Sequence, residues 1–265
     1  MAYAELVAAT NFTFLEGASH PFEMVGQAAG LGLSGIGICD RNSMAGVVRA
    51  FAAARDLTKD HPGFKLAVGT RLAFTDGTPD IAVYPMDRAA YGRLSALLTT
   101  GNRRGPKGEC HLTAQDLIAH LEGQLLIVIP RDDRVEEDGS ITAWLATLAP
   151  GRVWLAASHR FDGRDRARLN RLAQIALTAG VPMLATADAL YHEPTRSILQ
   201  DVLTCIRLGV TIMEAGRRLA PNAERFVRHP DDMARLFQDF PEAVAETRKL
   251  LARDIFTGSA QIRVP

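Results

Sequence analysis

Gly35-Ile36-Gly37-Ile38-Cys39-Asp40-Arg41-Asn42 is a short apolar stretch that ends in an acid and a base. It predicts a buried strand that carries Asp40 and Arg41 to its C-terminal end. Parallel α/β folds build their functional sites at that end, because the loops that face a ligand follow it. A carboxylate suits a metal ion, whereas a neighbouring guanidinium repels one. The pair therefore poses the question whether the chain is an enzyme or a domain that has lost its metal site.

The rest of the chain alternates short apolar runs with amphipathic helical patterns. Strands are predicted at residues 3–9, 35–39, 65–74, 81–84, 124–129, 153–157 and 182–186. Continuous apolar runs are typical of parallel strands that are covered on both faces. Seven such strands between helices predict βαβ units with right-handed crossovers. We expect an α/β fold with a closed or nearly closed barrel, and an open doubly wound sheet is the alternative.

Several residues mark the limits of helices. Pro21 predicts the first turn of a helix whose Glu23 side chain can bond back to the start of that helix. Candidate caps of later helices are Ser43, Asp87 and the pair Thr113 and Asp116. Gly180 is expected to end the helix at 165–179. Residues 101–110 and 131–139 are expected to be exposed loops. After Leu190, helices at 194–208, 230–237 and 241–252 follow one another without strands, and 256–265 form no complete element. We predict a barrel domain over 1–220 and C-terminal helices over 221–265.

Length and composition indicate a globular protein. The 265 residues match the usual size of a closed α/β barrel, about 250 residues. Lys+Arg and Asp+Glu balance at 30 each, so no overall field attracts nucleic acid or an anionic membrane. Three scattered cysteines favour a reducing cytoplasm over a disulfide framework. No apolar run approaches the roughly 18 residues of a membrane span, and the N-terminus lacks the basic start of a signal peptide.

Four groups at or near strand ends could build a metal site: Asp40, Asp80, His159 and Asp188. Carboxylates and imidazoles from different strands are how barrels bind divalent metals for hydrolysis. A single Asp after a strand more often caps the next helix. Arg41 and Arg71 argue against a metal, since a guanidinium near a divalent cation costs several kcal/mol. We expect them instead to pair with the acids, Asp40 included, in a salt-bridged cluster.

Other motifs carry less weight. Gly30-Leu31-Gly32-Leu33 lies at a helix end, so it is not a phosphate-binding loop, and no Cys-x-x-Cys pair exists. The basic residues Arg103, Arg104 and Lys107 could contact DNA phosphates or another domain. A solvated, mobile loop is the more common explanation for such a run.

Blocks of this sequence resemble the polymerase-and-histidinol-phosphatase (PHP) domain of bacterial C-family DNA polymerases. The blocks are residues 11–21 (NFTFLEGASHP), 38–49 (ICDRNSMAGVVR), 183–191 (MLATADALY) and 201–207 (DVLTCIR). Residues 90–94 (AYGRL) and 107–112 (KGECHL) resemble the error-prone translesion branch rather than the replicative α subunit of DNA polymerase III. The resemblance covers nearly the whole chain in the family's order. It implies a distorted barrel of seven βα units and places Arg263-Val264-Pro265 near the start of the polymerase palm.

The resemblance also implies a multinuclear zinc- or manganese-type cluster, most of whose ligands are replaced here. The family's opening His-x-His falls on Val7-Ala8-Ala9, and its Asp-His falls on Asp40-Arg41. Arg71 stands in the place of a Glu, Asp80 lies near the place of a His, and His159 matches a later His or Cys position. The closing Asp-x-His becomes Asp188-Ala189-Leu190. We therefore expect no metal and no cofactor in this segment.

Three functional hypotheses follow. The first is a non-enzymatic scaffold in an error-prone, damage-induced translesion DNA polymerase. It would pack on the palm and thumb, which would hold magnesium and carry out nucleotidyl transfer, and would meet DNA and accessory proteins through the whole enzyme. The second is a metal-dependent phosphoesterase or 3′–5′ exonuclease that uses Asp40, Asp80, His159 and Asp188. The third, an unrelated small-molecule barrel enzyme, would need a deep pocket free of arginine–acid pairs.

Overall fold

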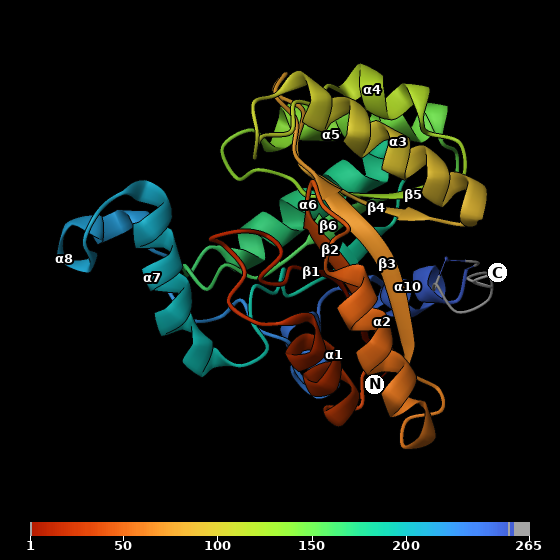
Figure 1. Ribbon diagram of the computed structural model, residues 1–265. Helices are drawn as coiled ribbons and strands as arrows, with labels where there is room; N and C mark the ends of the chain where they lie inside the picture. Colours follow the sequence, from red (N-terminus) through yellow and green to blue (C-terminus); the bar gives the residue numbers. More distant parts are fainter. Residues whose placement is uncertain (1, 254, 257–265) are drawn as a thin grey trace.

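A single curled sheet of seven strands forms the centre of the molecule (Figure 1). The computed structural model describes residues 2–253 and 255–256. All seven predicted strands are present. They are β1 (Ala4–Ala8), β2 (Gly35–Arg41), β3 (Lys65–Leu72), β4 (Ile81–Pro85), β5 (Gln124–Val128), β6 (Val153–Ala157) and β7 (Met183–Ala185).

The strands lie side by side in chain order, from β1 to β7. Most neighbours are parallel, but β4 runs antiparallel to both β3 and β5. The expectation of βαβ units throughout is therefore wrong at β4. Strand β4 reverses because the connection from β3, residues 73–80, is too short for a parallel crossover, which needs a dozen residues or more. This reversal brings residue 80 to the same end of the sheet as the end of β3.

The sheet closes into a distorted barrel through the residues that follow β7. Ala8 and Ala189 form an isolated parallel bridge. The Ala9 N–H donates to Ala189 O at 2.9 Å, and the Ala189 N–H donates to Val7 O at 3.0 Å. These bonds lie at the C-terminal end of the strands. The predicted nearly closed barrel is confirmed, and its seam lies between β1 and β7.

Helices surround the sheet and extend beyond it. They are α1 (Pro21–Gly30), α2 (Val47–Asp56), α3 (Arg88–Arg104), α4 (Ala114–Ala119), α5 (Val135–Leu148), α6 (Asp165–Ala179), α7 (Ser197–Leu208), α8 (Ile212–Ala215), α9 (Pro230–Leu236) and α10 (Pro241–Leu251), with 3-10 turns η1 (Leu57–Lys59), η2 (Pro194–Arg196) and η3 (Gly216–Arg218). Asp87 caps α3, and Thr113 with Asp116 caps α4 in a capping box, as predicted. Gly180 ends α6 at φ 67°.

Three local predictions were wrong. Ser43 does not cap α2, because the preceding turn places Gly46 at the cap position and Ser43 Oγ accepts from the Ala45 N–H. The predicted loop 101–110 begins four residues later than expected, at residue 105, because α3 continues to Arg104. Helix α5 starts inside the predicted loop 131–139. Its first turn contains Glu136, Glu137 and Asp138, and their negative charges interact favourably with the positive N-terminal end of the helix dipole.

The core has an inner and an outer layer. The inner layer fills the barrel and contains Leu6, Tyr84 and Trp154, all buried. The Tyr84 hydroxyl donates to Leu6 O at 2.7 Å. Gly37 and Gly69 leave room for this ring, because a Cβ on either would lie within 2.6 Å of a Tyr84 atom. Glycine in these strands is therefore explained by the close approach of one aromatic ring.

Helix α10 covers the seam on the opposite end of the barrel. Thr247 Oγ1 accepts from the Ala4 N–H of β1 at 3.1 Å, and Leu250 and Leu251 belong to the inner core. The C-terminal helices thus share a core with the barrel, and the boundary at residue 220 stays a prediction. Most of the predicted unstructured end, including Arg263-Val264-Pro265, lies outside the described residues. Among the described helices, none is both long and apolar enough to cross a lipid bilayer.

Candidate functional site

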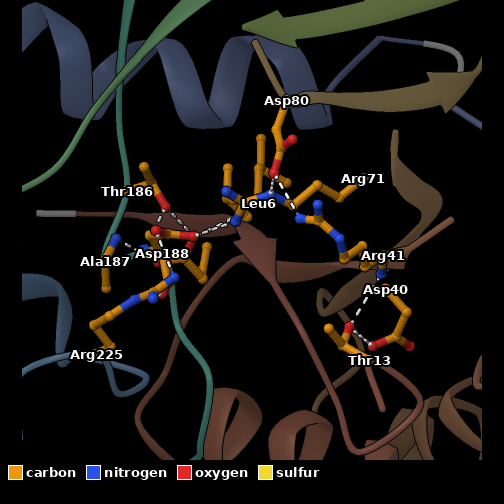
Figure 2. A network of polar contacts seen from close by, with 12 residues as sticks. Leu6, Thr13, Asp40, Arg41, Arg71, Asp80, Thr186, Ala187, Asp188 and Arg225 are labelled. Carbon is orange, nitrogen blue, oxygen red and sulfur yellow. Dashed lines mark hydrogen bonds and ion pairs between the residues drawn. The ribbon is translucent and has the colours of Figure 1, made fainter. Parts of the chain in front are cut away.

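The candidate site is the C-terminal end of the barrel strands, called the mouth below. Strand β2 delivers Asp40 and Arg41, and its neighbour β3 places Arg71 directly beside Arg41 in the register. Asp80 precedes β4, and Asp188 follows β7 next to the seam. Figure 2 shows Arg71 and Arg41 close to Asp80, with Asp188 and Arg225 on the other side of Leu6, a residue of β1. The sequence-based expectation that strand ends bring these residues to one end of the fold agrees with this geometry.

Arg71 links two acids that come from opposite sides of the mouth. Its Nε lies 2.8 Å from Asp80 Oδ2, and its Nη1 lies 3.0 Å from Asp188 Oδ1. Arg41 Nη1 also contacts Asp80 Oδ2, at 3.0 Å. Burial by itself would lower the pKa of Arg71, but Asp188 and Asp80 raise that pKa above its ordinary value. The predicted pairing of Arg41 and Arg71 with acids is therefore present for Asp80 and Asp188.

Asp188 is surrounded by guanidinium groups. Arg225 Nη2 lies 2.6 Å from Asp188 Oδ2, and Arg160 Nη1 lies 3.7 Å from the same oxygen. Burial would raise the pKa of this carboxyl, but Arg225, Arg71 and Arg160 hold it well below its usual range. The backbone of Asp188 has φ 50°, a conformation that Asp adopts more readily than most residues. The Arg225 Nε–H donates to its carbonyl at 2.9 Å and fixes this turn.

Asp40 has different partners from those predicted. Its carboxylate accepts from the Thr10 N–H at 2.6 Å and from the hydroxyls of Thr10 and Thr13, each at 2.8 Å. The expected charge pairing of Asp40 is therefore wrong. Neighbouring side chains on a strand point to opposite sides, so Arg41 turns toward Asp80 instead. Burial raises the pKa of Asp40, and the bonds from Thr10 and Thr13 oppose this rise.

His159 does not join the acids of the mouth. Its Nε2 donates to Leu236 O at 2.9 Å, and its ring packs edge-on against Phe237. Its Nδ1 lies 3.7 Å from Asp165 Oδ2. Both ring nitrogens are thus directed at α9 and at the start of α6. The geometry separates this residue from the other three candidate ligands.

Apolar residues line the rest of the mouth. Ala9 and Leu190 are each 6% exposed and belong to one small cluster with Ala18 and Tyr191, against which Leu203 and Phe226 pack. Val7 is buried in the inner core. Three of the positions where the resemblance places imidazole ligands therefore hold buried apolar side chains. They offer no lone pair to a metal.

Glu5 is a buried acid that the sequence analysis missed. Its Oε1 accepts from the Val7 N–H at 2.8 Å and the Thr186 hydroxyl at 2.6 Å. Its Oε2 accepts from the Ala187 N–H at 2.8 Å and the Tyr3 hydroxyl at 2.7 Å. Burial raises the pKa of Glu5, and these four donors oppose the rise. Glu5 thus ties β1 to the segment after β7 and supports the position of Asp188. A lone acid inside an apolar strand was the available signal.

Comparisons with known proteins agree with this geometry. Residues 5–147, more than half of the chain, match the family model of the PHP domain. The chain belongs to the PHP domain family. The family resemblance seen in the sequence is thereby confirmed.

Two relatives illustrate where such a domain occurs. The chain is 51% identical over 251 residues to an error-prone DNA polymerase of Brucella abortus, and 53% identical over 256 residues to one of Bradyrhizobium diazoefficiens. Each match covers 94% of this chain and 22–23% of the relative. The chain therefore spans about a quarter of the length of these relatives. Both relatives carry the error-prone name that residues 90–94 and 107–112 indicated.

The PHP fold is also found in a distant solved structure. A protein of Bifidobacterium adolescentis, described provisionally as a metal-dependent phosphoesterase, superposes with a TM-score of 0.51 at 17% identity. The match covers 71% of this chain and 87% of that one. At this identity the likeness concerns the fold alone. It agrees with the distorted barrel described above.

The donor set at this PHP mouth does not fit a cluster of divalent metals. Such clusters need carboxylates and neutral imidazoles with free lone pairs. Within residues 2–253 and 255–256, no three His, Cys, Asp or Glu side chains gather closely enough to hold one ion. Guanidinium nitrogens contact Oδ2 of Asp80 and both carboxylate oxygens of Asp188. Hydroxyl and amide donors contact both oxygens of Asp40. A divalent cation would have to displace these donors and lie against permanent positive charges.

The basic residues of the PHP domain's third helix are only partly available to a ligand. Arg103 and Arg104 form the last turn of α3, and Lys107 follows in the loop. Arg104 forms a two-pronged contact with Asp116, with Nη2 at 2.8 Å from Oδ1. This contact and the bonds from Thr113 lower the pKa of Asp116 to about 2. A role of Arg103, Arg104 and Lys107 in binding DNA stays a prediction.

The capping role of Asp116 gives a pH-dependent prediction. Replacing Asp116 by Asn removes charged acceptors from the capping box of α4 and lowers the free energy of unfolding at pH 7 by about 1 kcal/mol. The folded pKa of about 2 lies below the unfolded value near 3.9, so this contribution is present above about pH 4. It is lost as the pH falls toward 2. Urea unfolding of both proteins at pH 7, 4 and 2.5 checks this, and a constant difference would contradict it.

Proposed function

We propose that this chain is the PHP domain of an error-prone DNA polymerase and acts there as a structural domain without catalytic activity. The relatives with this name, four times as long as the match, support the first part of the proposal. Nucleotidyl transfer and its magnesium ions would then belong to the palm, outside this sequence. The domain would support damage-induced translesion synthesis by packing against the palm and thumb, with DNA and accessory proteins bound by the whole enzyme.

The bridge from Arg71 to Asp80 and Asp188 carries the proposal. The permanent positive charge of Arg71 joins two acids, and a hydrolytic PHP site would use these acids to bind metals. Arg225 and Arg160 add further positive charge around Asp188. Three guanidinium groups around one carboxylate stabilise the mouth without any metal. A hydrolytic reaction of the family type would lack both its Lewis acid and the water that a metal activates.

Metal analysis and a hydrolysis assay test the proposal. The purified protein is incubated with zinc or manganese, passed through a desalting column and measured by plasma mass spectrometry. We expect no stoichiometric metal and no hydrolysis of bis-p-nitrophenyl phosphate or of the 3′ end of single-stranded DNA. A metal-dependent phosphoesterase of the same fold serves as the positive control. Stoichiometric metal with hydrolysis that Asp188→Asn abolishes would instead establish the phosphoesterase or exonuclease alternative.

A further inference from the structure

The helix pair α7–α8, residues 197–215, stands off to one side of the barrel (Figure 1). We call it the arm. Helix α7 carries an apolar stripe made of Ile198, Leu199, Val202 and Ile206. Residues spaced by three or four lie on the same face of a helix, so these four side chains form one surface. All four are exposed, with Ile198 at 71% and Ile206 at 59%.

Two polar residues of α7 that lie away from the stripe are buried. Gln200 and Thr204 are 6% and 2% exposed, and Gln200 Nε2 donates to Thr204 Oγ1 at 3.0 Å. A surface helix normally places its apolar stripe against the core and its polar residues in solvent. Helix α7 departs from this pattern, because its stripe is exposed while Gln200 and Thr204 are buried together with Cys205. The arrangement is held in place, since Arg207 pairs with Glu16 at 2.6 Å and Leu203 packs beside Leu190.

Helix α8 also exposes apolar side chains. Ile212 is 51% exposed and Met213 is 90% exposed. Four aliphatic side chains on α7 and two more apolar ones on α8 are thus exposed on the arm. Soluble monomers rarely expose such a face unless a partner covers it. The arm is therefore a candidate docking surface.

We infer that the stripe of the arm docks onto an apolar surface of the same polymerase polypeptide, in the part that lies outside this sequence. This inference rests on the proposed function. The relatives hold more than three quarters of their length outside the matched segment, so a covering surface is available on the same chain. A covalently linked partner is present at high effective concentration, which favours it over a second copy. The arm would thus fix the position of the PHP barrel relative to the rest of the polymerase.

Oxidation of Met213 tests the inference in the full-length polymerase. Dilute hydrogen peroxide oxidises exposed methionines, and peptide mass spectrometry measures the rate at each one. With Met213 covered, we expect it to oxidise as slowly as the fully buried Met24. Ile206→Lys places a charge in the docked surface and should accelerate oxidation of Met213 about tenfold or more, as expected for loss of one buried aliphatic contact. Val202→Lys should repeat this result.

Leu177→Lys is the matched control. Leu177 lies on α6, is 75% exposed, and receives the same substitution outside the arm. It should leave Met213 oxidation unchanged. Rapid oxidation of Met213 in the unmodified polymerase would overturn the inference. Protection that disappears on dilution, together with a dimer in sedimentation, would also overturn it in favour of a second copy. A natural gene product of only 28.7 kDa would instead refute the proposed function.

Discussion

Replacing Arg71 by alanine lowers the free energy of unfolding by about 3 kcal/mol, the cost of breaking a buried charge pair. The substitution leaves Asp80 and Asp188 facing each other across the mouth without the guanidinium that joins them. Arg225 and Arg160 still neutralise Asp188 in part, which keeps the loss at the lower end of the range for such pairs. Urea or guanidinium unfolding, followed by circular dichroism, measures the change.

Arg41→Ala is the control for this experiment. It removes the same charge from the neighbouring position, but Arg41 is 43% exposed and contacts only Asp80 among the acids of the mouth. Exposed pairs contribute little, so we expect a loss below about 1 kcal/mol. Equal losses for the two variants would contradict the central role of Arg71. An unchanged free energy of unfolding in Arg71→Ala would show that Asp80 and Asp188 can lie together at the mouth without Arg71 between them.

Replacing Glu5 by glutamine lowers the free energy of unfolding by about 3 kcal/mol, although the side chains have nearly the same shape. Each carboxylate oxygen accepts one backbone N–H, from Val7 on one side and Ala187 on the other. These donors cannot turn away. In either orientation the amide NH2 group therefore faces a buried N–H and leaves it unsatisfied, and charge-assisted bonds are lost as well.

Chemical denaturation at pH 7 measures this change, with Glu122→Gln as control. The Glu122 side chain is 85% exposed, so its replacement should alter stability by no more than about 0.5 kcal/mol. Loosening of the seam should accompany the Glu5 effect, visible as faster hydrogen exchange of the Ala9 and Ala189 amides. Unchanged stability of Glu5→Gln would mean that Glu5 does not hold β1 to the segment after β7.

The strands were predictable because each is a short apolar run with both faces covered. Residues 153–157 agree with β6 residue for residue, and β7 lies within the predicted run 182–186. The direction of β4 was not predictable from its own residues, since an apolar run looks the same in parallel and antiparallel sheets. Only the missing helix between β3 and β4 indicated the reversal. Helix α5 was missed because its acidic first turn resembled a solvated loop.

The candidate site was predictable only in part. Asp40, Arg71 and Asp188 were found because each ends or follows an apolar run. Arg225 gave no signal, because it lies in an irregular segment that is remote in sequence from the seven strands. The stripe of α7 has helical spacing that predicts a buried face, yet the fold turns it outward.

The sequence alone determined that Asp40, Arg71 and Asp188 reach the mouth, because strand ends are set by local apolar runs. It did not determine which acid pairs with which arginine. Arg71 and Asp188 are 117 residues apart and meet only because the barrel closes at Ala8 and Ala189. Asp40 lies beside Arg41 in sequence, yet it bonds to Thr10 and Thr13, because successive side chains on a strand point in opposite directions. Closure of the sheet, a property of the whole tertiary structure, decided those partners.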